Sequence, residues 1–217
     1  LVTGVQTCAL PNLIHSTLLD NAVTELSKLP SIGKKTALRL VLHLLKKEKA
    51  EVEKLAEALI NMRNNIQFCS QCGNISDEAQ CSICLNPQRQ NHTVCIVESI
   101  RDVIAIENTQ QYNGVYHVLG GLISPLDGVG PDQLNIECLL KRIQQQQIAE
   151  IIFAISPTIQ GDTTIFYIQK KLQAYNITTT SIARGIAFGG ELEYADEMTL
   201  AKSIRNRLPV NQLVNTF

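Results

Sequence analysis

No apolar run in this 217-residue sequence approaches the roughly 20 residues that a helix needs to cross a bilayer, so we expect no membrane contact. The first residues, LVTGVQTCALPN, lack the basic start of a signal peptide, which predicts a cytoplasmic protein. The net charge is only −1, which argues against a uniformly basic nucleic-acid binder. Tryptophan is absent, but 45% hydrophobic and 18% charged residues indicate a globular chain rather than a disordered one.

Two common nucleotide-binding motifs are missing as well. The sequence has no G-x-x-x-x-G-K-[ST], the loop that cradles the phosphates of ATP, and no G-x-G-x-x-G after a strand. Binding of ATP through a P-loop is therefore excluded, and a Rossmann dinucleotide fingerprint is absent. The function must rest on the motifs that are present.

Two kinds of hydrophobic periodicity divide the chain. The first third has apolar residues at helical spacing, whereas the last two thirds alternate short apolar runs with helical stretches. We predict helices over residues 16–28, 34–47, 51–66, 101–108, 132–146, 163–175 and 197–207, and strands over residues 93–97, 115–120, 150–156 and 177–183. This alternation predicts a parallel sheet covered on both faces, and the whole is an α+β multidomain chain with a helical head and an α/β body.

Four of the seven cysteines form two Cys-x-x-Cys pairs, namely Cys69, Cys72, Cys81 and Cys84. Four thiolates in two short loops are the usual ligands of a tetrahedral zinc ion, and a closed shell leaves no position for a catalytic water. We therefore predict one structural Zn²⁺ ion. A disulfide, a metal-free site and an iron electron-transfer centre are the alternatives. Cys8, Cys95 and Cys138 are scattered, and we interpret them as packing thiols.

The segment LPSIGKKTALRL, residues 29–40, lies in the most basic part of the chain. It has a tight turn that ends at a glycine, and free backbone N–H groups at the start of the next helix would attract a phosphate. Two cations four residues apart share one face of that helix. The pattern predicts sequence-independent DNA binding through phosphates; a capped hairpin with a solvated basic face is the simpler alternative. The residues that we expect to bind DNA are Gly33, Lys34, Lys35 and Arg39.

Glu98 ends the first predicted strand, at the edge where parallel sheets bind ligands. A magnesium-dependent phosphoryl-transfer site needs several carboxylates at such an edge. The third predicted strand supplies Ser156 and Thr158 there, and neither provides the charge. Asp162 is better placed to cap the helix that follows. The sequence therefore contains no catalytic residues that we can identify, and Glu98 can equally be an ordinary acid at a strand end.

The order of these motifs resembles the RecR family of bacterial recombination proteins. The matching stretches are LPSIGKKTALRL, CSQC and CSIC, VCIVESIRDVIAIE, YHVLGGLISPLDGVGPD, GDTT and ARGIAFGGELEYADEMTL. The resemblance implies a helix-hairpin-helix domain, a four-cysteine zinc finger, a Toprim domain (the α/β unit of topoisomerases and primases) and a C-terminal Walker-B-like segment. Active Toprim enzymes carry a strand-end Glu and an Asp-x-Asp pair. Glu98 falls on the Glu position, whereas Ser156 and Thr158 fall on the two Asp positions.

The same resemblance implies a function. Members of the family are non-enzymatic DNA-repair mediators that form ring-shaped tetramers around DNA and work with RecO and RecF to load RecA onto single strands coated with single-strand-binding protein. This implies a protein of the bacterial cytoplasm that associates with the nucleoid. A magnesium-dependent Toprim nuclease or topoisomerase-like enzyme is the alternative, and the missing Asp pair counts against it. The residues expected to bind protein partners are Glu98, Asp102 and Asp127, the last in the loop of residues 124–131.

We divide the chain into five parts on this basis. They are a non-family extension, disordered or artefactual (1–13), the helix-hairpin-helix domain (14–67), the four-cysteine zinc finger (68–90), the Toprim domain (91–176) and the C-terminal assembly segment (177–217). We expect the zinc finger to fix the orientation of the head relative to the body. Two positions depart from the family pattern: Ser31 stands where a Gly is usual in the hairpin, and Gln160 stands where Glu is frequent.

Overall fold

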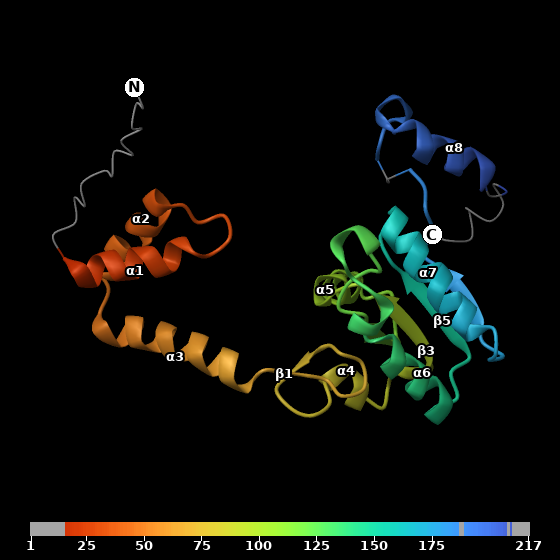
Figure 1. The fold of residues 1–217 in the computed structure, drawn as a ribbon, viewed down its shortest axis with the longest axis horizontal. Coiled ribbons are helices and arrows are strands. Elements are labelled where there is room, and N and C mark those ends of the chain that lie inside the picture. Colours follow the sequence, from red (N-terminus) through yellow and green to blue (C-terminus); the bar gives the residue numbers. More distant parts are fainter. Residues whose placement is uncertain (1–15, 187–188, 208, 210–217) are drawn as a thin grey trace, which may run out of the picture. The chain divides into compact units, whose positions relative to one another are not determined.

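The computed structural model describes residues 16–186, 189–207 and 209 of the chain (Figure 1). The chain divides into two compact units, the first ending at Asn65 and the second beginning at Ile66. The expected extension of residues 1–13, with Cys8, lies outside the described residues. Within those residues, no helix is both long enough and apolar enough to span a bilayer.

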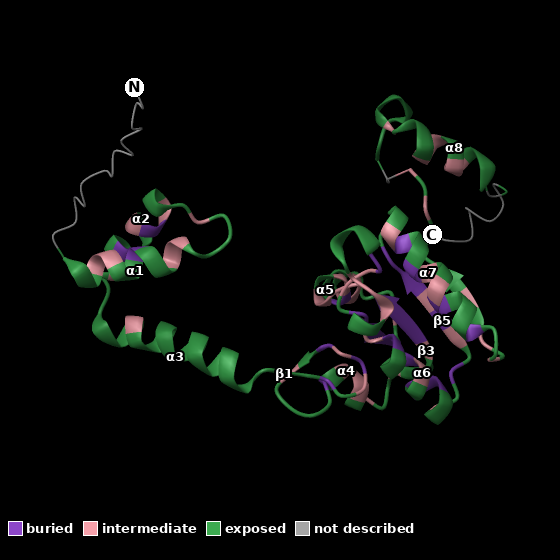
Figure 2. Cartoon of the chain, viewed as in Figure 1, coloured by how far each residue is buried: buried purple, intermediate pink, exposed green. Residues whose placement is uncertain are grey.

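The described part of the first unit, from residue 16 onward, consists of three helices, α1 (Thr17–Ser27), α2 (Lys34–Leu44) and α3 (Lys49–Asn65). α1 begins where the Ser16 hydroxyl accepts a hydrogen bond from the N–H of Leu19, which satisfies a donor that the helix start leaves free. The buried core between α1 and α2 is small and consists of Val23, Ala37 and Val41. α3 buries none of its 17 residues, and Figure 2 shows it exposed along nearly its whole length.

The second unit is built on a parallel four-stranded sheet with the strand order β4-β3-β5-β6. Its strands are β3 (Gln90–Val97), β4 (Gly114–Val118), β5 (Glu150–Ala154) and β6 (Thr178–Ser181). Val97 pairs with both Val118 and Ala154, so the carboxyl ends of three strands meet at one edge. Val94 and Ile96 in β3 are fully buried, and β-branched side chains of this kind suit a strand that is covered on both faces.

Helices cover both faces of this sheet (Figures 1 and 2). They are α5 (Ile100–Thr109), α6 (Ile136–Gln145) and α7 (Ile159–Leu172). α5 packs on one face through Val103, whereas α6 and α7 pack on the other through Leu139 and Ile168. Full burial of a side chain of this size contributes about 1.5–3 kcal/mol, so these contacts are a main source of stability. The observed layers confirm the predicted parallel sheet with helices on both faces.

A small irregular element beside the sheet carries the cysteines; we call residues 66–89 the knuckle. It contains the antiparallel strands β1 (Gln67–Phe68) and β2 (Ile75–Ser76) and the short helix α4 (Ser82–Leu85). The N–H of Val118 in β4 donates a 2.7 Å hydrogen bond to the carbonyl of Cys72, which joins the knuckle to the sheet. Elements of two to four residues are too short for a hydrophobic period, so the sequence did not predict them.

The helix predicted over residues 132–146 begins later than expected. Residues 131–133 form a separate 3-10 turn, η2 (Pro131–Gln133), and Leu134 then adopts an extended backbone with ψ 156°. α6 therefore starts only at Ile136. The remaining elements are η1 (Pro125–Asp127), η3 (Leu192–Tyr194) and α8 (Glu197–Arg205).

α7 begins four residues before its predicted start, and this corrects the role of one acid. Thr158 caps the helix, because its hydroxyl accepts a 3.0 Å hydrogen bond from the N–H of Gly161. The interpretation of Asp162 as the cap is therefore wrong. Asp162 lies inside the first turn and forms a 2.6 Å ion pair with Arg184.

A partly buried ion pair ties the end of the knuckle to α5. Arg89 Nη1 donates to Glu107 Oε1 at 2.9 Å, and the Tyr116 hydroxyl donates to the same oxygen at 2.7 Å. The Arg89 and Glu107 side chains are only 15% and 28% exposed. Arg89 lowers the pKa of Glu107 below its usual range; burial opposes this shift and Tyr116 reinforces it.

Replacing Glu107 with Gln should lower the free energy of unfolding at pH 7 by about 1–3 kcal/mol, because a charged acceptor of three hydrogen bonds, two from Arg89 and one from Tyr116, is lost. The lowered pKa of folded Glu107 means that its contribution is present above the ordinary pKa of 4.5 and is lost as the pH falls through the folded pKa. Acidification should therefore destabilise the wild type more steeply than the variant. Urea unfolding at neutral and acidic pH measures both effects.

The matched control is Asp162→Asn, which removes a more exposed ion pair from the same unit and should change stability little. Equal losses in the two variants, or parallel pH profiles of wild type and Glu107→Gln, would contradict the role of the buried pair.

Candidate metal centre and nucleic-acid interface

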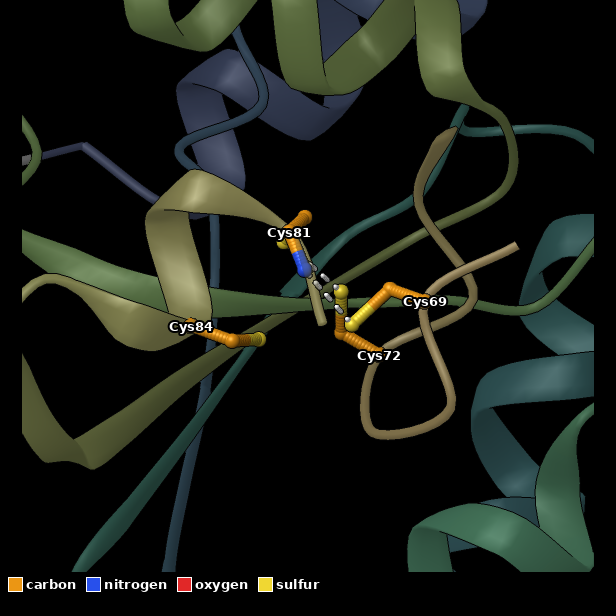
Figure 3. Close-up of side chains that lie close together, drawn as sticks. All are labelled: Cys69, Cys72, Cys81 and Cys84. Carbon is orange, nitrogen blue, oxygen red and sulfur yellow. Dashed lines mark hydrogen bonds between the residues drawn. The ribbon is translucent and has the colours of Figure 1, made fainter. Parts of the chain in front are cut away.

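The four knuckle cysteines converge on one point, as Figure 3 shows. Their sulfur atoms all lie within 4.8 Å of one another, and the Sγ atoms of Cys72 and Cys81 are 3.6 Å apart. A tetrahedral zinc ion with Zn–S bonds of about 2.3 Å holds its sulfurs about 3.8 Å apart. Three of the four cysteines are buried, and the fourth, Cys84, is half-buried. The donor set therefore fits one structural zinc ion with a closed, dry shell.

The environment of the thiols also fits a cation. Burial tends to raise the pKa of the Cys69 thiol, but hydrogen bonds from the backbone N–H groups of Cys81, Gln71 and Cys72 outweigh it and lower the pKa to about 7. The side chain of Cys84, followed by burial, raises the pKa of the Cys72 thiol. Four negative charges cannot share this space unless a metal ion lies between them. Bound zinc supplies that charge and so links metal binding to folding of the knuckle.

The start of α2 offers free backbone donors beside exposed cations. Gly33 caps the helix without a side-chain hydrogen bond, so the first N–H groups of α2 are available to an anion. Lys34, Lys35 and Arg39 are exposed, and none of them forms an ion pair within the described residues. The structure thus brings together the four residues that the sequence singled out for DNA binding.

Ser31 and Gly33 shape the turn in different ways. Ser31 has a φ of 65°, a left-handed conformation in which a side chain costs about 1 kcal/mol or more and which a Gly would adopt without that cost. Gly33 has a φ of −81°, which any residue adopts, and a Cβ added to it would meet nothing within 4 Å. Gly33 therefore leaves open space in front of the helix rather than permitting a special backbone conformation.

Glu98 and the loop after β5 lie at the same carboxyl edge of the sheet. The two positions where an active Toprim enzyme would carry Asp are occupied by Ser156 and Thr158. Glu98 follows β3 directly, and Ser156 and Thr158 follow β5. The Thr158 hydroxyl is engaged in capping α7. The constellation of carboxylates that holds magnesium is not formed by these residues.

Glu98 lines a cavity of about 650 Å³ between the knuckle and this edge of the sheet. Its side chain is half-buried, and no described residue donates a hydrogen bond to its carboxylate. The other two expected partner-binding residues do not line this cavity. Asp102 accepts hydrogen bonds from the N–H and hydroxyl of Ser99 at the start of α5, and Asp127 accepts one from the hydroxyl of Ser124.

Sequence reasoning missed two residues of this cavity. His117 in β4 is 1% exposed; its Nε2 lies 2.8 Å from the carbonyl of Asn135, and burial lowers its pKa to about 4. Cys138 on α6 is exposed and lines the same cavity, so its interpretation as a packing thiol is wrong. Cys95 is buried in the core, as expected. All five residues of β4 are buried, so the place of His117 within this predicted strand could have signalled its burial, but nothing in the sequence indicated the cavity.

Four family models match successive parts of the chain. They describe the RecR helix-hairpin-helix (residues 19–63), the RecR zinc finger domain with four cysteine ligands (66–86), the Toprim domain (92–183) and the RecR C-terminal region (185–208). Together with the four converging sulfurs, the zinc-finger match confirms the prediction of one structural zinc site. The predicted order of domains, from helical head to Toprim sheet, is confirmed in the same way.

Several bacterial proteins named "Recombination protein RecR" are similar to this chain over most of its length. The protein from Amoebophilus asiaticus is 60% identical over 193 residues, which cover 89% of this chain and 96% of the relative. The protein from Cytophaga hutchinsonii is 62% identical over 88% of this chain and 94% of the relative. The protein from Flavobacterium johnsoniae is 57% identical over 89% and 94%, respectively. The chain therefore belongs to the RecR family.

Proposed function

We propose that this protein is a DNA-binding recombination mediator that acts in DNA repair without catalysing a reaction. It binds DNA of any sequence and works with RecO and RecF to load RecA onto single strands, in the bacterial cytoplasm at the nucleoid. The helix-hairpin-helix domain (14–67) binds DNA, and the zinc finger (68–90) holds the zinc ion. The Toprim domain (91–176) binds protein partners, and the C-terminal segment (177–217) joins neighbouring subunits. The names of the relatives support the recombination role.

The observation that carries the proposal is the start of α2. Backbone N–H groups, the helix dipole and the exposed cations of Lys35 and Arg39 all favour a phosphate at the same place. All of these groups are hydrogen-bond donors or cations gathered at the start of one helix, which is the arrangement that binds a phosphate. The contact is therefore to the DNA backbone and independent of sequence.

The carboxyl edge of the sheet supports a non-catalytic role. Hydrolysis or strand passage by a Toprim domain requires several carboxylates that hold magnesium against the phosphate. Glu98 stands opposite Ser156 and Thr158, whose hydroxyls do not carry charge. Glu98 is accordingly free to serve another purpose, and we assign it to the binding of RecO.

The cavity beside Glu98 has the properties of a partner site. It is lined by apolar side chains such as Phe68 and Ile100, and it presents a single carboxylate, Glu98, without a hydrogen-bond donor among the described residues. A basic side chain of a partner would neutralise that charge in a half-buried setting, where ion pairs are stronger than at the surface. Phe68 is 71% exposed and adds an aromatic contact of the kind that interfaces favour.

Exposed apolar surface supports assembly into a ring-shaped tetramer. α3 exposes four large apolar side chains, which are Leu55 at 45%, Leu59 at 56%, Ile60 at 58% and Met62 at 50%. Apolar residues of the three helices also line a groove of about 710 Å³ in the first unit. A helix that packs so little of its apolar surface within its own chain is typical of a subunit interface. The exposed Tyr194 and Ile204 give the C-terminal segment a similar character. The mass of the assembly in solution tests this part of the proposal.

A Glu98→Lys variant tests the function at its partner site. Reversing the charge places a cation against the basic side chain of the partner, so the affinity for RecO should fall at least about tenfold. Binding of labelled DNA in the absence of RecO should stay within about twofold of the wild type, because the DNA contacts lie on α2. Calorimetry with RecO and fluorescence anisotropy with DNA measure the two affinities separately.

Glu150→Lys is the matched control, because Glu150 is also a half-buried acid of the sheet but begins β5, at the opposite edge. The exposed thiol of Cys138 gives a second readout, since RecO bound in the cavity should slow its labelling by a maleimide. Loss of DNA binding with unchanged RecO affinity would mean that the two surfaces are assigned the wrong way round. A wild type that retains no DNA, with or without RecO, would refute the proposed function.

A further inference from the structure

A groove of about 440 Å³ runs along α2 beyond the hairpin turn. Its lining residues recur at spacings of three and four, so the five that lie within α2 share one face of the helix, and the sixth follows just beyond its end. They are Lys35, Leu38, Arg39, Leu42, His43 and Lys46. Four of them carry nitrogen donors, and we call Lys35, Arg39, His43 and Lys46 the α2 basic stripe.

The cations of the stripe are not neutralised within the protein. Neither Lys35, Arg39 nor Lys46 forms an ion pair with any described residue, and α2 itself contains no Asp or Glu. The adjacent Lys47 behaves differently, because it pairs with Glu51 at 3.1 Å. The stripe is thus a local excess of positive charge on a chain whose net charge is −1.

The length and the lining of the groove suit a nucleic-acid backbone. Lys35 and His43 are eight positions apart, which corresponds to about 12 Å along the helix, and Lys46 extends the groove just beyond the helix end. A strand of duplex DNA presents one phosphate per about 3.4 Å of its axis, so the stripe is long enough for several successive phosphates. Leu38 and Leu42 also line the groove and offer no hydrogen-bonding side chain, so they can contact sugars and form no hydrogen bond to a base edge.

We propose that the DNA strand anchored at the start of α2 continues along the whole stripe, with His43 and Lys46 as further phosphate contacts. The inference rests on the proposed DNA-binding function, because the anchor is the helix N-terminus. The far end of α2 carries a partial negative charge, so its backbone repels a phosphate. Side chains must hold the strand there, and His43 and Lys46 are the exposed donors of the groove at that end.

The double variant His43→Ala/Lys46→Ala tests the inference in the full-length protein. Its dissociation constant for labelled oligonucleotides of two unrelated sequences should rise roughly 3- to 10-fold for both, as expected for lost phosphate contacts. The slope of log affinity against log salt should decrease by about 0.7–0.9 for the contact of Lys46. Zinc content, assembly mass and the thermal midpoint should match the wild type. Lys47→Ala is the control and should bind like the wild type, because its charge is already paired.

The outcomes separate this inference from the function on which it rests. If Lys35→Ala/Arg39→Ala weakens binding and His43→Ala/Lys46→Ala does not, the strand leaves α2 after its first turns and the inference is overturned alone. If neither pair matters, the hairpin does not bind DNA and the proposed function falls with it. A loss of binding in His43→Ala/Lys46→Ala that comes with a lower thermal midpoint assigns both residues to the stability of the helix end, and also overturns the inference.

Discussion

A Cys72→Ser variant is expected to lose its zinc and to unfold at a markedly lower temperature than the wild type. Cys72 is 1% exposed, the most enclosed of the four ligands, and its carbonyl also accepts the hydrogen bond from Val118. Structural zinc contributes about 10–16 kcal/mol of binding free energy in small zinc fingers. If roughly 4 kcal/mol of this is lost from the second unit, the midpoint of thermal unfolding falls by about 8–16 °C, at roughly 2–4 °C per kcal/mol.

Cys138→Ser is the matched control, because it replaces an exposed thiol that does not belong to the cluster. It should keep one zinc ion per chain and the wild-type midpoint. Elemental analysis after dialysis against a chelator measures the metal, and circular dichroism measures the midpoint. A Cys72→Ser protein with a full zinc content and unchanged melting would show that the site is not what holds the knuckle together.

The second large effect concerns the start of α2. Changing Lys35 and Arg39 together to Ala should weaken DNA binding roughly 10- to 100-fold at moderate salt and equally for unrelated sequences. Each phosphate contact adds about 0.7–0.9 to the slope of log affinity against log salt, so losing two should flatten the slope by about 1.4–1.8 per bound chain. In a tetrameric ring, every subunit presents the same pair and the loss is multiplied. Salt titrations on two DNA sequences provide the measurement.

Lys28→Ala/Lys47→Ala is the control for that experiment. It removes the same amount of charge from the same helical unit, but both lysines are already paired with carboxylates, at 2.6 and 3.1 Å. Its affinity should stay close to that of the wild type. An equal loss in the two double variants would mean that net charge, rather than the α2 surface, governs binding. A loss limited to one DNA sequence would point to base contacts instead of phosphate contacts.

The features that the sequence predicted correctly depend on residues close together in the chain. The two Cys-x-x-Cys pairs predict a metal site, because the two ligands of each pair lie within one short loop. The buried run that ends at Val97 predicts a strand, and the alternation of such runs with helical periods predicts a parallel sheet. That Lys35 and Arg39 lie on one face of α2 follows from helical spacing alone, and the same spacing places His43 on that face one turn further along.

The features that it did not predict depend on tertiary contacts. Arg89, Glu107 and Tyr116 form one network, although no period or motif links them. The start of α7 was misplaced because Thr158 and Asp162 are both good capping residues. The first turn lies close against the loop after β5, where a Cβ on Gly161 would come within 2.1 Å of the Ser156 carbonyl oxygen, and this contact is not visible in the sequence. The cavity beside Glu98 exists only where the knuckle meets the sheet.

The hydrogen bond between Val118 and Cys72 has a consequence for aggregation. β4 is an outer strand of the sheet, and an outer strand with free backbone groups is a template for pairing with another chain. Here three of the outward groups are occupied: Arg142 donates to the carbonyl of Tyr116 at 2.8 Å, Asn135 donates to that of Val118 at 3.0 Å, and the Val118 N–H donates to the carbonyl of Cys72. Zinc depletion would release the last of these and uncover one end of a strand rich in valine. Bound zinc thus helps to prevent aggregation by strand pairing between copies of this protein.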